Sequence, residues 1–244
     1  MWNEKLTGRA DLHMHTSLSD GRGTTQQMLD YAAQYCNLDV IAITDHDVLD
    51  ASLWACSQQG RYPFEIVPGV EVTSAEGHVL ALWVTEPIPT RMSLAETVSA
   101  IHEQDGIAIL AHPLDPAITP RASWRYFRHP EVLIKIGIDA VEVLNAGAFT
   151  PGSNRLAYEV FRHMPLPHVG SSDAHMPMSI GSGLTRFKGH TAADLRYSFE
   201  MGLTAAEGNP WQITTYLRLF ITSLQKKQSD SLGANARSTR LTLT

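Results

Sequence analysis

The sequence predicts an α/β fold, either a parallel barrel or a doubly wound sheet, from two observations. Short apolar runs alternate with amphipathic stretches of helical period along most of the chain, the order typical of parallel sheets covered by helices. One connection, residues 74–77, is too short for the helical crossover that parallel neighbours need. We therefore expect an antiparallel hairpin at that point and an irregular barrel.

Seven apolar runs have the length and composition of strands, and helices are expected between and after them. The strand-like runs are residues 10–15, 39–44, 66–73, 78–84, 107–111, 140–144 and 168–171. The first expected helix follows an N-cap at residues 24–25, and another extends from the Ser93–Glu96 capping box to Gly106. The remaining expected helices cover residues 48–59, 154–164, 191–201 and 211–225. Residues 226–244 lack periodicity, so we expect a disordered tail after a single domain of residues 1–225.

The composition is that of a globular enzyme, with 43% hydrophobic and 18% charged residues among 244. A formal net charge of −6 argues against binding of long nucleic acids, which needs a basic face. Cys36 and Cys56 show no C-x-x-C spacing, as in reduced cytosolic proteins. No apolar run approaches the ~20 residues that span a membrane, and no signal peptide is evident. We expect a soluble, cytoplasmic protein without a membrane partner, whose oligomeric state the sequence leaves open.

The stretch A-D-L-H-M-H near the N-terminus carries the first chemical signal. Alternation along a strand places Asp11, His13 and His15 on one face, with Leu12 and Met14 on the other. Two imidazoles spaced in this way can bind one metal ion, and Asp11 could hold a ring N–H of a ligand in the required tautomer. A pair of histidines on a solvated strand face is the alternative interpretation.

The other strand-like runs also end in histidines and carboxylates. Such strand ends converge on one face of an α/β barrel, where active sites lie. Any one of these histidines could be an ordinary buried, hydrogen-bonded residue, but their joint placement predicts a metal site. Besides His13 and His15, the set comprises His46, Glu71, His112, Asp173 and His175 at strand ends, and His78 across the hairpin from Glu71.

Five motifs in this order resemble those of the PHP family, the polymerase and histidinol phosphatase metalloenzymes. They are D-L-H-M-H-T with S-D-G, I-T-D-H-D, P-G-V-E-V-T with G-H-V-L-A-L, A-H-P and S-S-D-A-H, and the resemblance covers residues 9–208. It implies a distorted seven-stranded barrel with two or three metal ions. Family members include small-molecule phosphatases, exonucleases and polymerase-associated domains, and some relatives hydrolyse carbamates. Because no long insertion separates the motifs, the chain resembles the compact form of the family.

The resemblance also implies a ligand set, carried over position by position. One ion would take His13, His15, Glu71 and Asp173; a second would share Glu71 and add His78 and His112; a third would take Asp20, His46 and His175. Glu71, Asp173 and His175 would be the catalytic residues. This nitrogen and oxygen ligand set suits Mn, Fe or Zn.

These residues favour hydrolysis of a small phosphorylated molecule. Asp20, Glu71 and Asp173 bring three negative charges and three divalent ions bring six positive ones, so the site would be positive by three and would attract a phosphate dianion. Coordination lowers the pKa of water from ~16 toward ~7 and supplies a hydroxide nucleophile. The alternatives are a carbamate or carboxylic ester hydrolase with the same metal site, and a metal-binding domain without turnover.

Other polar residues are weaker candidates. Arg121, in the loop after A-H-P, and Asn145, at the end of the sixth strand, could contact substrate. Asp11, Asp45 and Glu142 could support metal ligands. Each has an ordinary structural alternative, such as a solvated loop arginine or a strand-end cap.

Overall fold

The computed structural model of the protein describes residues 5–212, 214–216, 218, 219 and 221, without the side chains of residues 120 and 121. It divides into two compact units, residues 1–210 and 211–244. The described residues 214–216, 218, 219 and 221 of the second unit are helical, within the predicted helix 211–225. The predicted disordered tail, residues 226–244, lies outside the described residues.

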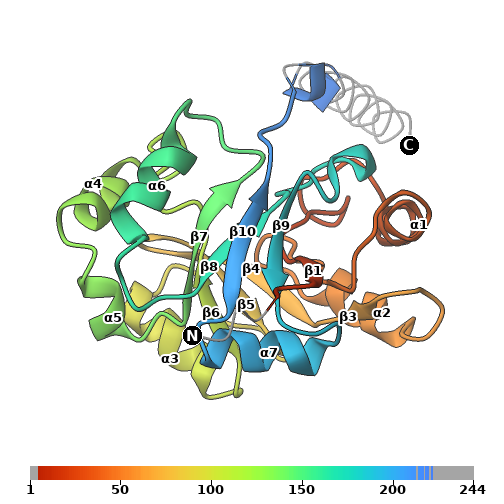
Figure 1. Ribbon diagram of the computed structural model, residues 1–244, viewed down its shortest axis with the longest axis horizontal. Helices are drawn as coiled ribbons and strands as arrows, with labels where there is room; N and C mark the ends of the chain where they lie inside the picture. Colours follow the sequence, from red (N-terminus) through yellow and green to blue (C-terminus); the bar gives the residue numbers. More distant parts are fainter. Residues whose placement is uncertain (1–4, 213, 217, 220, 222–244) are drawn as a thin grey trace, which may run out of the picture. The chain divides into compact units, whose positions relative to one another are not determined.

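The strands of the first unit form two mixed five-stranded sheets (Figure 1). The first sheet has the order β10-β9-β1-β2-β3, in which β1, β2 and β3 are parallel and β9 is antiparallel to both of its neighbours. The second has the order β4-β5-β6-β7-β8 and ends in three parallel strands. The bounds are β1 Gly8–Asp11, β2 Val40–Ile41, β3 Glu65–Ile66, β4 Gly69–Ser74, β5 Gly77–Leu82, β6 Ile107–Leu110, β7 Ala140–Asn145, β8 His168–Ser171, β9 Gly183–Phe187 and β10 Thr204–Gly208.

The predicted α/β class is confirmed, but the hydrogen-bonded ladders do not close into one seven-stranded barrel. β8 lies against β9 of the other sheet, but no continuous backbone ladder joins them. Instead, the Thr185 hydroxyl accepts a hydrogen bond from the backbone N–H of Gly170 and donates one to its carbonyl. A Cβ on Gly183 would lie 2.1 Å from the Ser171 carbonyl oxygen, so only glycine permits this approach. At the other junction, a single bridge pairs His46 with Glu71. The barrel-like arrangement therefore consists of two open sheets.

The strand predictions were correct in place and incomplete in number. The hairpin between β4 and β5 is present, with Ser74 opposite Gly77. The single run 66–73 is split into β3 and β4, and Pro68, which lacks an N–H for a ladder, lies in the break. The sequence analysis missed β9 and β10, because G-L-T-R-F and T-A-A-E-G show no run of large apolar residues.

The predicted helices of the first unit are present as α1 Thr25–Tyr35, α2 Asp50–Ser57, α3 Leu94–His102, α6 Ser153–Phe161 and α7 Ala192–Glu200. Capping boxes that begin at Thr24, Ser93 and Thr191 start three of them. Two helices, α4 Pro120–Arg128 and α5 Val132–Ile136, and the 3₁₀ turn η1 Pro177–Ser179 were not predicted. None of the described helices is long and apolar enough to cross a membrane.

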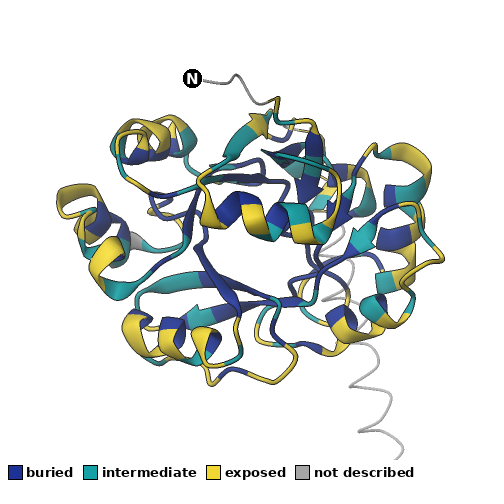
Figure 2. Ribbon diagram, turned by 60° about the horizontal axis from the view of Figure 1, so that its bottom comes forward, coloured by how far each residue is buried: buried dark blue, intermediate teal, exposed yellow. Residues whose placement is uncertain are grey.

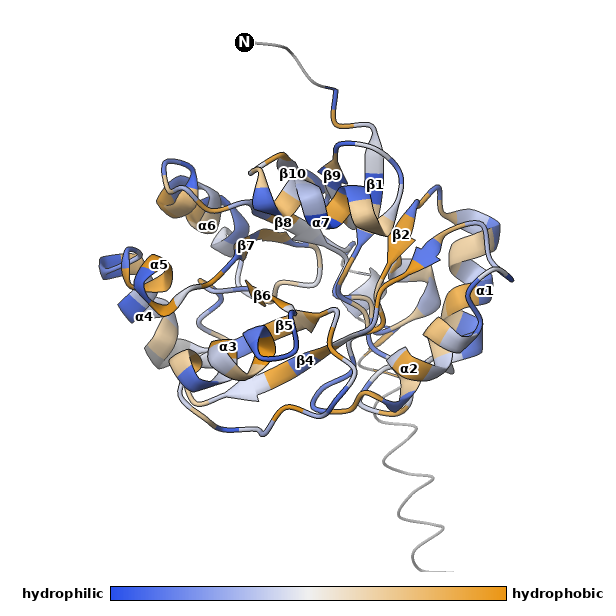
Figure 3. Ribbon diagram, turned by 90° about the horizontal axis from the view of Figure 1, so that it is seen from below, coloured by the Kyte–Doolittle hydropathy of each residue, from blue (hydrophilic) through white to orange (hydrophobic). Residues whose placement is uncertain are grey.

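The helices surround the strands (Figure 3), and the exposed residues of the helices lie on their outer faces (Figure 2). Alternation along β4 sends Val70 and Val72 into the hydrophobic core, and therefore turns Glu71 and Thr73 to the other face. Leu12 and Met14 are likewise buried in the core, as predicted. This alternation positions the polar side chains that follow.

Candidate metal centre

All nine predicted metal ligands lie together: most are at or just after the carboxyl ends of strands, whereas His78 is at the start of β5 and Asp20 is in a turn. They form four overlapping groups, in each of which donor atoms from every member lie within 4.8 Å of one another. The groups are His13, His15 and Glu71; His13, His112 and Asp173; His46, Glu71 and His78; and His15, Asp20, His46 and His175. The overlap indicates one continuous cluster of candidate ligands rather than separate sites.

Glu71 is at the middle of this centre and is fully buried. Each of its two oxygens faces a different set of ring nitrogens. Oε1 lies 3.0 Å from Nδ1 of His78 and 3.0 Å from Nε2 of His112; Oε2 lies 3.1 Å from Nε2 of His13, 3.2 Å from Nε2 of His15 and 3.0 Å from Nδ1 of His46. A carboxylate placed between two such sets can bind two ions at once.

Asp173 faces Glu71 across the two histidines of the first strand. Its Oδ1 lies 3.4 Å from Nε2 of His13 and 3.2 Å from Nε2 of His15. The backbone of Asp173 has φ 51°, and that of His112 has φ 30°. These left-handed conformations are costly for residues with a Cβ and concentrate at functional sites.

Asp20 stands on the open side of the centre, with its side chain 54% exposed. Its Oδ2 lies 3.2 Å from Nε2 of His175 and 3.9 Å from Nε2 of His46. The loop that carries Asp20 is held by the buried carboxylate of Asp45, which accepts hydrogen bonds from the backbone and side chain of Thr16, each at 2.7 Å, and from Ser19. Asp45 therefore anchors the loop and does not contact a ring nitrogen among the described interactions.

The donor atoms fit divalent ions better than they fit one another. Several of these buried atoms have no hydrogen-bond partner, although ring nitrogens and carboxylate oxygens lie 3.0–3.4 Å apart, because the bond angles are unsuitable. The atoms are His13 Nε2, His15 Nδ1 and Nε2, Glu71 Oε2, His78 Nδ1, His112 Nδ1 and Asp173 Oδ1. Two ligands of one ion with bonds of about 2.1 Å lie about 3.0–3.4 Å apart, which is the separation seen here.

The electrostatics of the centre also favour a cation. Burial alone raises the pKa of Glu71, but the charge of His13 and the hydrogen bond with His112 hold that pKa well below its usual range. Burial lowers the pKa of His15, yet Asp173 and Glu71 outweigh it and raise that pKa to about 10. Protons on these imidazoles occupy the positions that a divalent ion takes, so metal binding must release them.

Glu142, on β7, contacts the backbone and side chains of several residues at the centre. Its Oε1 lies 3.1 Å from Nδ1 of His13 and accepts a hydrogen bond from Ser171; its Oε2 accepts bonds from the backbone N–H of His112 at 2.7 Å and from Asn145 at 2.9 Å. This buried carboxylate therefore contacts the ends of four strands.

The expectation that Asp11 holds a ligand ring was wrong. Asp11 instead accepts backbone hydrogen bonds from Ser172 at 3.0 Å and Gly181 at 2.8 Å. Alternation predicts that Asp11 and His13 point the same way, but β1 ends at Asp11, two residues before the histidine. The carboxylate that contacts the His13 ring is Glu142, 129 residues away along the chain.

The two predicted substrate contacts have different outcomes. Asn145 is buried and donates its amide hydrogens to Glu142 at 2.9 Å and to Asp173 at 3.0 Å. It therefore orients two carboxylates, and its contact with substrate stays a prediction. Arg121 lies in α4, and its side chain lies outside the described residues.

Asp115 is a buried carboxylate that the sequence analysis missed. It accepts hydrogen bonds from the backbone N–H groups of Phe149 at 2.7 Å and Thr150 at 3.2 Å. It thereby joins the loop after His112 to the loop after Asn145. Its position two residues beyond A-H-P was the one available signal.

A buried cluster of histidines and carboxylates at the strand ends of an α/β fold is the arrangement of a metal-binding domain. The chain belongs to the PHP family. The family described as PHP-associated matches residues 151–203, the segment that contains Asp173 and His175.

The chain is also similar to three other proteins. An uncharacterized protein of Methanocaldococcus jannaschii is 32% identical over 149 residues, which are 57% of this chain and 82% of that protein. The phosphoribosyl 1,2-cyclic phosphate 1,2-diphosphodiesterase of Eggerthella lenta is 36% identical over 91 residues, 34% of each chain. A two-domain Bacteroides vulgatus protein containing a predicted PHP-like metal-dependent phosphoesterase has a similar fold, with a TM-score of 0.67 and 19% identity over 82% of this chain and 64% of that one.

Proposed function

We propose that the protein hydrolyses a phosphoester of a small molecule at a trinuclear centre of Mn, Fe or Zn ions. The observation that carries the proposal is the position of Glu71, whose two oxygens lie 3.0–3.2 Å from five imidazoles. Divalent ions, when bound, would supply Lewis acidity that activates water and stabilises charge on phosphoryl oxygens. The named activity of the Eggerthella lenta relative, a diphosphodiesterase, supports the phosphoester class.

The roles of the protein's own residues follow from burial. His13, His15 and Glu71 are fully buried, so they would form the rigid floor of the centre. Asp20, His46, His78 and His175 are partly exposed, so substrate would approach from their side. Asp173, between His15 and His175, would link the buried and the open halves of the centre. Arg121 remains a candidate contact for the phosphate.

A metal and substrate panel tests the proposal. Protein stripped by a chelator and reloaded with Mn, Fe or Zn would be assayed on phosphate monoesters, cyclic phosphates, carbamates and carboxylic esters. We expect phosphoester turnover that disappears on chelation and returns with metal. Turnover of carbamates or carboxylic esters alone would replace the proposal with that hydrolase class. Metal binding without any turnover would indicate a non-catalytic domain.

A further inference from the structure

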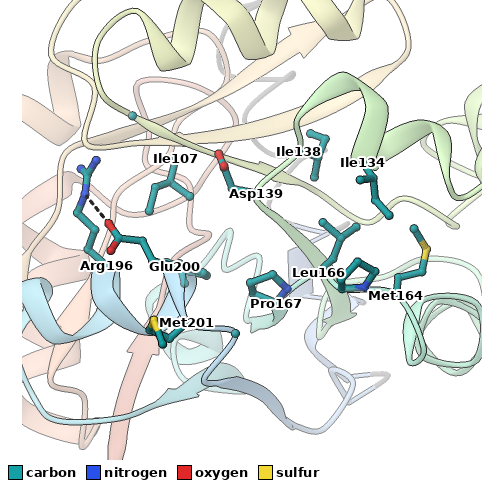
Figure 4. Close-up of a pocket in the computed structure, with 14 residues that line it drawn as sticks. Ile107, Ile134, Ile138, Asp139, Met164, Leu166, Pro167, Arg196, Glu200 and Met201 are labelled. Carbon is teal, nitrogen blue, oxygen red and sulfur yellow. Dashed lines mark ion pairs between the residues drawn. The ribbon is translucent and has the colours of Figure 1, made fainter.

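One cavity lies away from the metal centre. It has a volume of 690 Å³ and lies beside Ile107, Asp139 and Pro167, at or just before the amino ends of β6, β7 and β8 (Figure 4). The metal centre lies at the opposite, carboxyl ends. A smaller pocket of 480 Å³ does reach the centre, because His78 forms part of its wall.

We propose that this smaller pocket, between the β4–β5 hairpin and the start of α4, binds an uncharged, hydroxyl-bearing leaving group such as a sugar or another polyol. The inference rests on the proposed function and names its substrate class. The hairpin side of the pocket consists of residues 73–78, and the α4 side of Ile118, Thr119 and Ala122.

The pocket adjoins the metal centre at His78. Thr73 lies opposite His78 in the hairpin and two residues after Glu71 on β4, so alternation places Thr73 and Glu71 on the same face. Nδ1 of His78 lies 3.0 Å from Oε1 of Glu71. A phosphoryl group at the centre would therefore direct its leaving group along Thr73 and His78 into the pocket.

The lining combines apolar surface with one available hydroxyl. The Ser74 hydroxyl is engaged, since it donates to the Gly77 carbonyl at 2.6 Å. The Thr119 hydroxyl shares a hydrogen bond of 3.1 Å with Ser123. The Thr73 hydroxyl has no hydrogen bond to the described part of the chain, whereas its backbone N–H donates to Asp47 at 2.7 Å. Ile118 and Ala122 present apolar surface, and this mixture suits a sugar, which has C–H faces and hydroxyl edges.

The charge of the lining disfavours a second anion. Glu76 is a carboxylate, and it forms an ion pair with Arg125 and accepts the backbone N–H of Leu94 at 2.9 Å. Among the lining side chains that the structure describes, no lysine or arginine is present. A phosphate or carboxylate entering the pocket would lose water without gaining a cationic partner there, and this desolvation is costly. A neutral polar group incurs a much smaller penalty.

Steady-state kinetics of the metal-loaded protein tests the inference with four phosphomonoesters. Ribose 5-phosphate carries a neutral sugar, 3-phosphoglycerate a carboxylate, fructose 1,6-bisphosphate a second phosphate, and methyl phosphate no group that reaches the pocket. We expect kcat/KM for ribose 5-phosphate to exceed that for both anionic esters by at least about tenfold. A preference for 3-phosphoglycerate or fructose 1,6-bisphosphate would overturn the inference.

Two variants connect that preference to the pocket. Ala122→Phe should fill it from α4, and Thr73→Val should remove the hydroxyl while Thr73→Ser retains it. For Ala122→Phe and Thr73→Val, the ratio of kcat/KM for ribose 5-phosphate to that for methyl phosphate should fall about tenfold. Thr73→Ser should keep the wild-type ratio, as should Trp124→Phe on the exposed face of α4. An unchanged ratio in Ala122→Phe, with metal content and folding intact, would contradict the inference.

Equilibrium binding separates this inference from the proposed function. If ribose 5-phosphate binds wild-type protein but not Ala122→Phe, and no phosphoester is turned over, the pocket is confirmed and the phosphoesterase proposal fails. If methyl phosphate is turned over while ribose 5-phosphate has no advantage in binding or turnover, the phosphoesterase proposal stands and the pocket inference fails.

Discussion

Nδ1 of His13 lies 3.1 Å from Oε1 of Glu142, and both side chains are fully buried. An ionised carboxylate only accepts hydrogen bonds, so this contact fixes the proton on Nδ1 and leaves Nε2 directed at Glu71 and Asp173. Such a partner sets both the tautomer and the orientation of a metal-binding imidazole. Glu142 is thus a positioning residue for the centre.

Replacing Glu142 tests this relationship. Ser171, the backbone N–H of His112 and Asn145 all donate hydrogen bonds to the Glu142 carboxylate. In Glu142→Gln, the NH₂ group of the new amide would face at least one of these donors, and that hydrogen bond would be lost. We expect the affinity for metal to fall about 10–100-fold, measured by competition with a chelator of known affinity. Wild-type affinity in Glu142→Gln would contradict the positioning role. Glu159→Gln, a change on the exposed face of α6, is the matched control and should leave the affinity unchanged.

Glu71 and His46 should differ in how many ions they hold. Glu71→Gln keeps the shape of the side chain but removes the charge between two ions ~3.5–4 Å apart. We expect this variant to lose at least one ion and nearly all turnover, whereas His46→Ala should empty mainly the group that contains Asp20 and His175. Elemental analysis of both purified variants provides the measurement. A full metal count and wild-type rate in Glu71→Gln would show that Glu71 does not bridge.

The loop that carries Asp20 depends on a close backbone approach at Gly21. A Cβ on Gly21 would lie 2.2 Å from the carbonyl oxygen of His15, so Gly21→Ala must displace the loop. We expect fewer bound ions and a lower melting temperature. Gly60→Ala is the control, because its Cβ would meet nothing within 4 Å; its φ of 87° should cost about 1 kcal/mol of stability without loss of metal. Equal metal content in the two variants would argue against this role of Gly21.

The pKa of Asp11 predicts how the free energy of unfolding depends on pH. Burial raises the pKa of this carboxyl to about 6 from its ordinary value of 3.8. The folded state therefore holds the proton more tightly than the unfolded state does, so this contribution to stability is complete below pH 4 and is lost as the pH rises through 6. Its size is about 3 kcal/mol.

Asp11→Asn does not titrate at this position and isolates the effect. The difference in unfolding free energy, wild type minus Asp11→Asn, should decrease by up to about 3 kcal/mol between pH 4 and pH 7. Urea denaturation of both metal-free proteins at several pH values provides the measurement. A difference that is independent of pH, or that increases with pH, would show that Asp11 is ionised in the folded protein throughout this range.

The identity of the candidate ligands could be predicted because it depends on local pattern and on one general property of α/β folds. His13, Glu71, His112 and Asp173 each follow or end an apolar run, and the carboxyl ends of parallel strands converge. Local capping rules likewise predicted helices α1, α3 and α7, whose capping boxes connect residues only three apart. The hairpin after Ser74 could be predicted for the same reason, since its length excludes any other connection.

Tertiary structure alone decided the features that join distant parts of the chain. Which carboxylate contacts the His13 ring depends on how the ends of β1 and β7, strands of different sheets, converge at the centre, and no local period distinguishes Glu142 from Asp11 in that role. The two-sheet arrangement depends on β9 pairing with β1 across more than 170 residues, with a threonine hydroxyl and a glycine at the junction with β8. The pocket beside His78 exists only because α4 packs near the hairpin. Sequence alone therefore determined which residues could bind metal, because periodicity places them at strand ends. The folded chain determined which groups support them and what space lies beside them, because those contacts form between segments whose separation leaves no trace in local pattern.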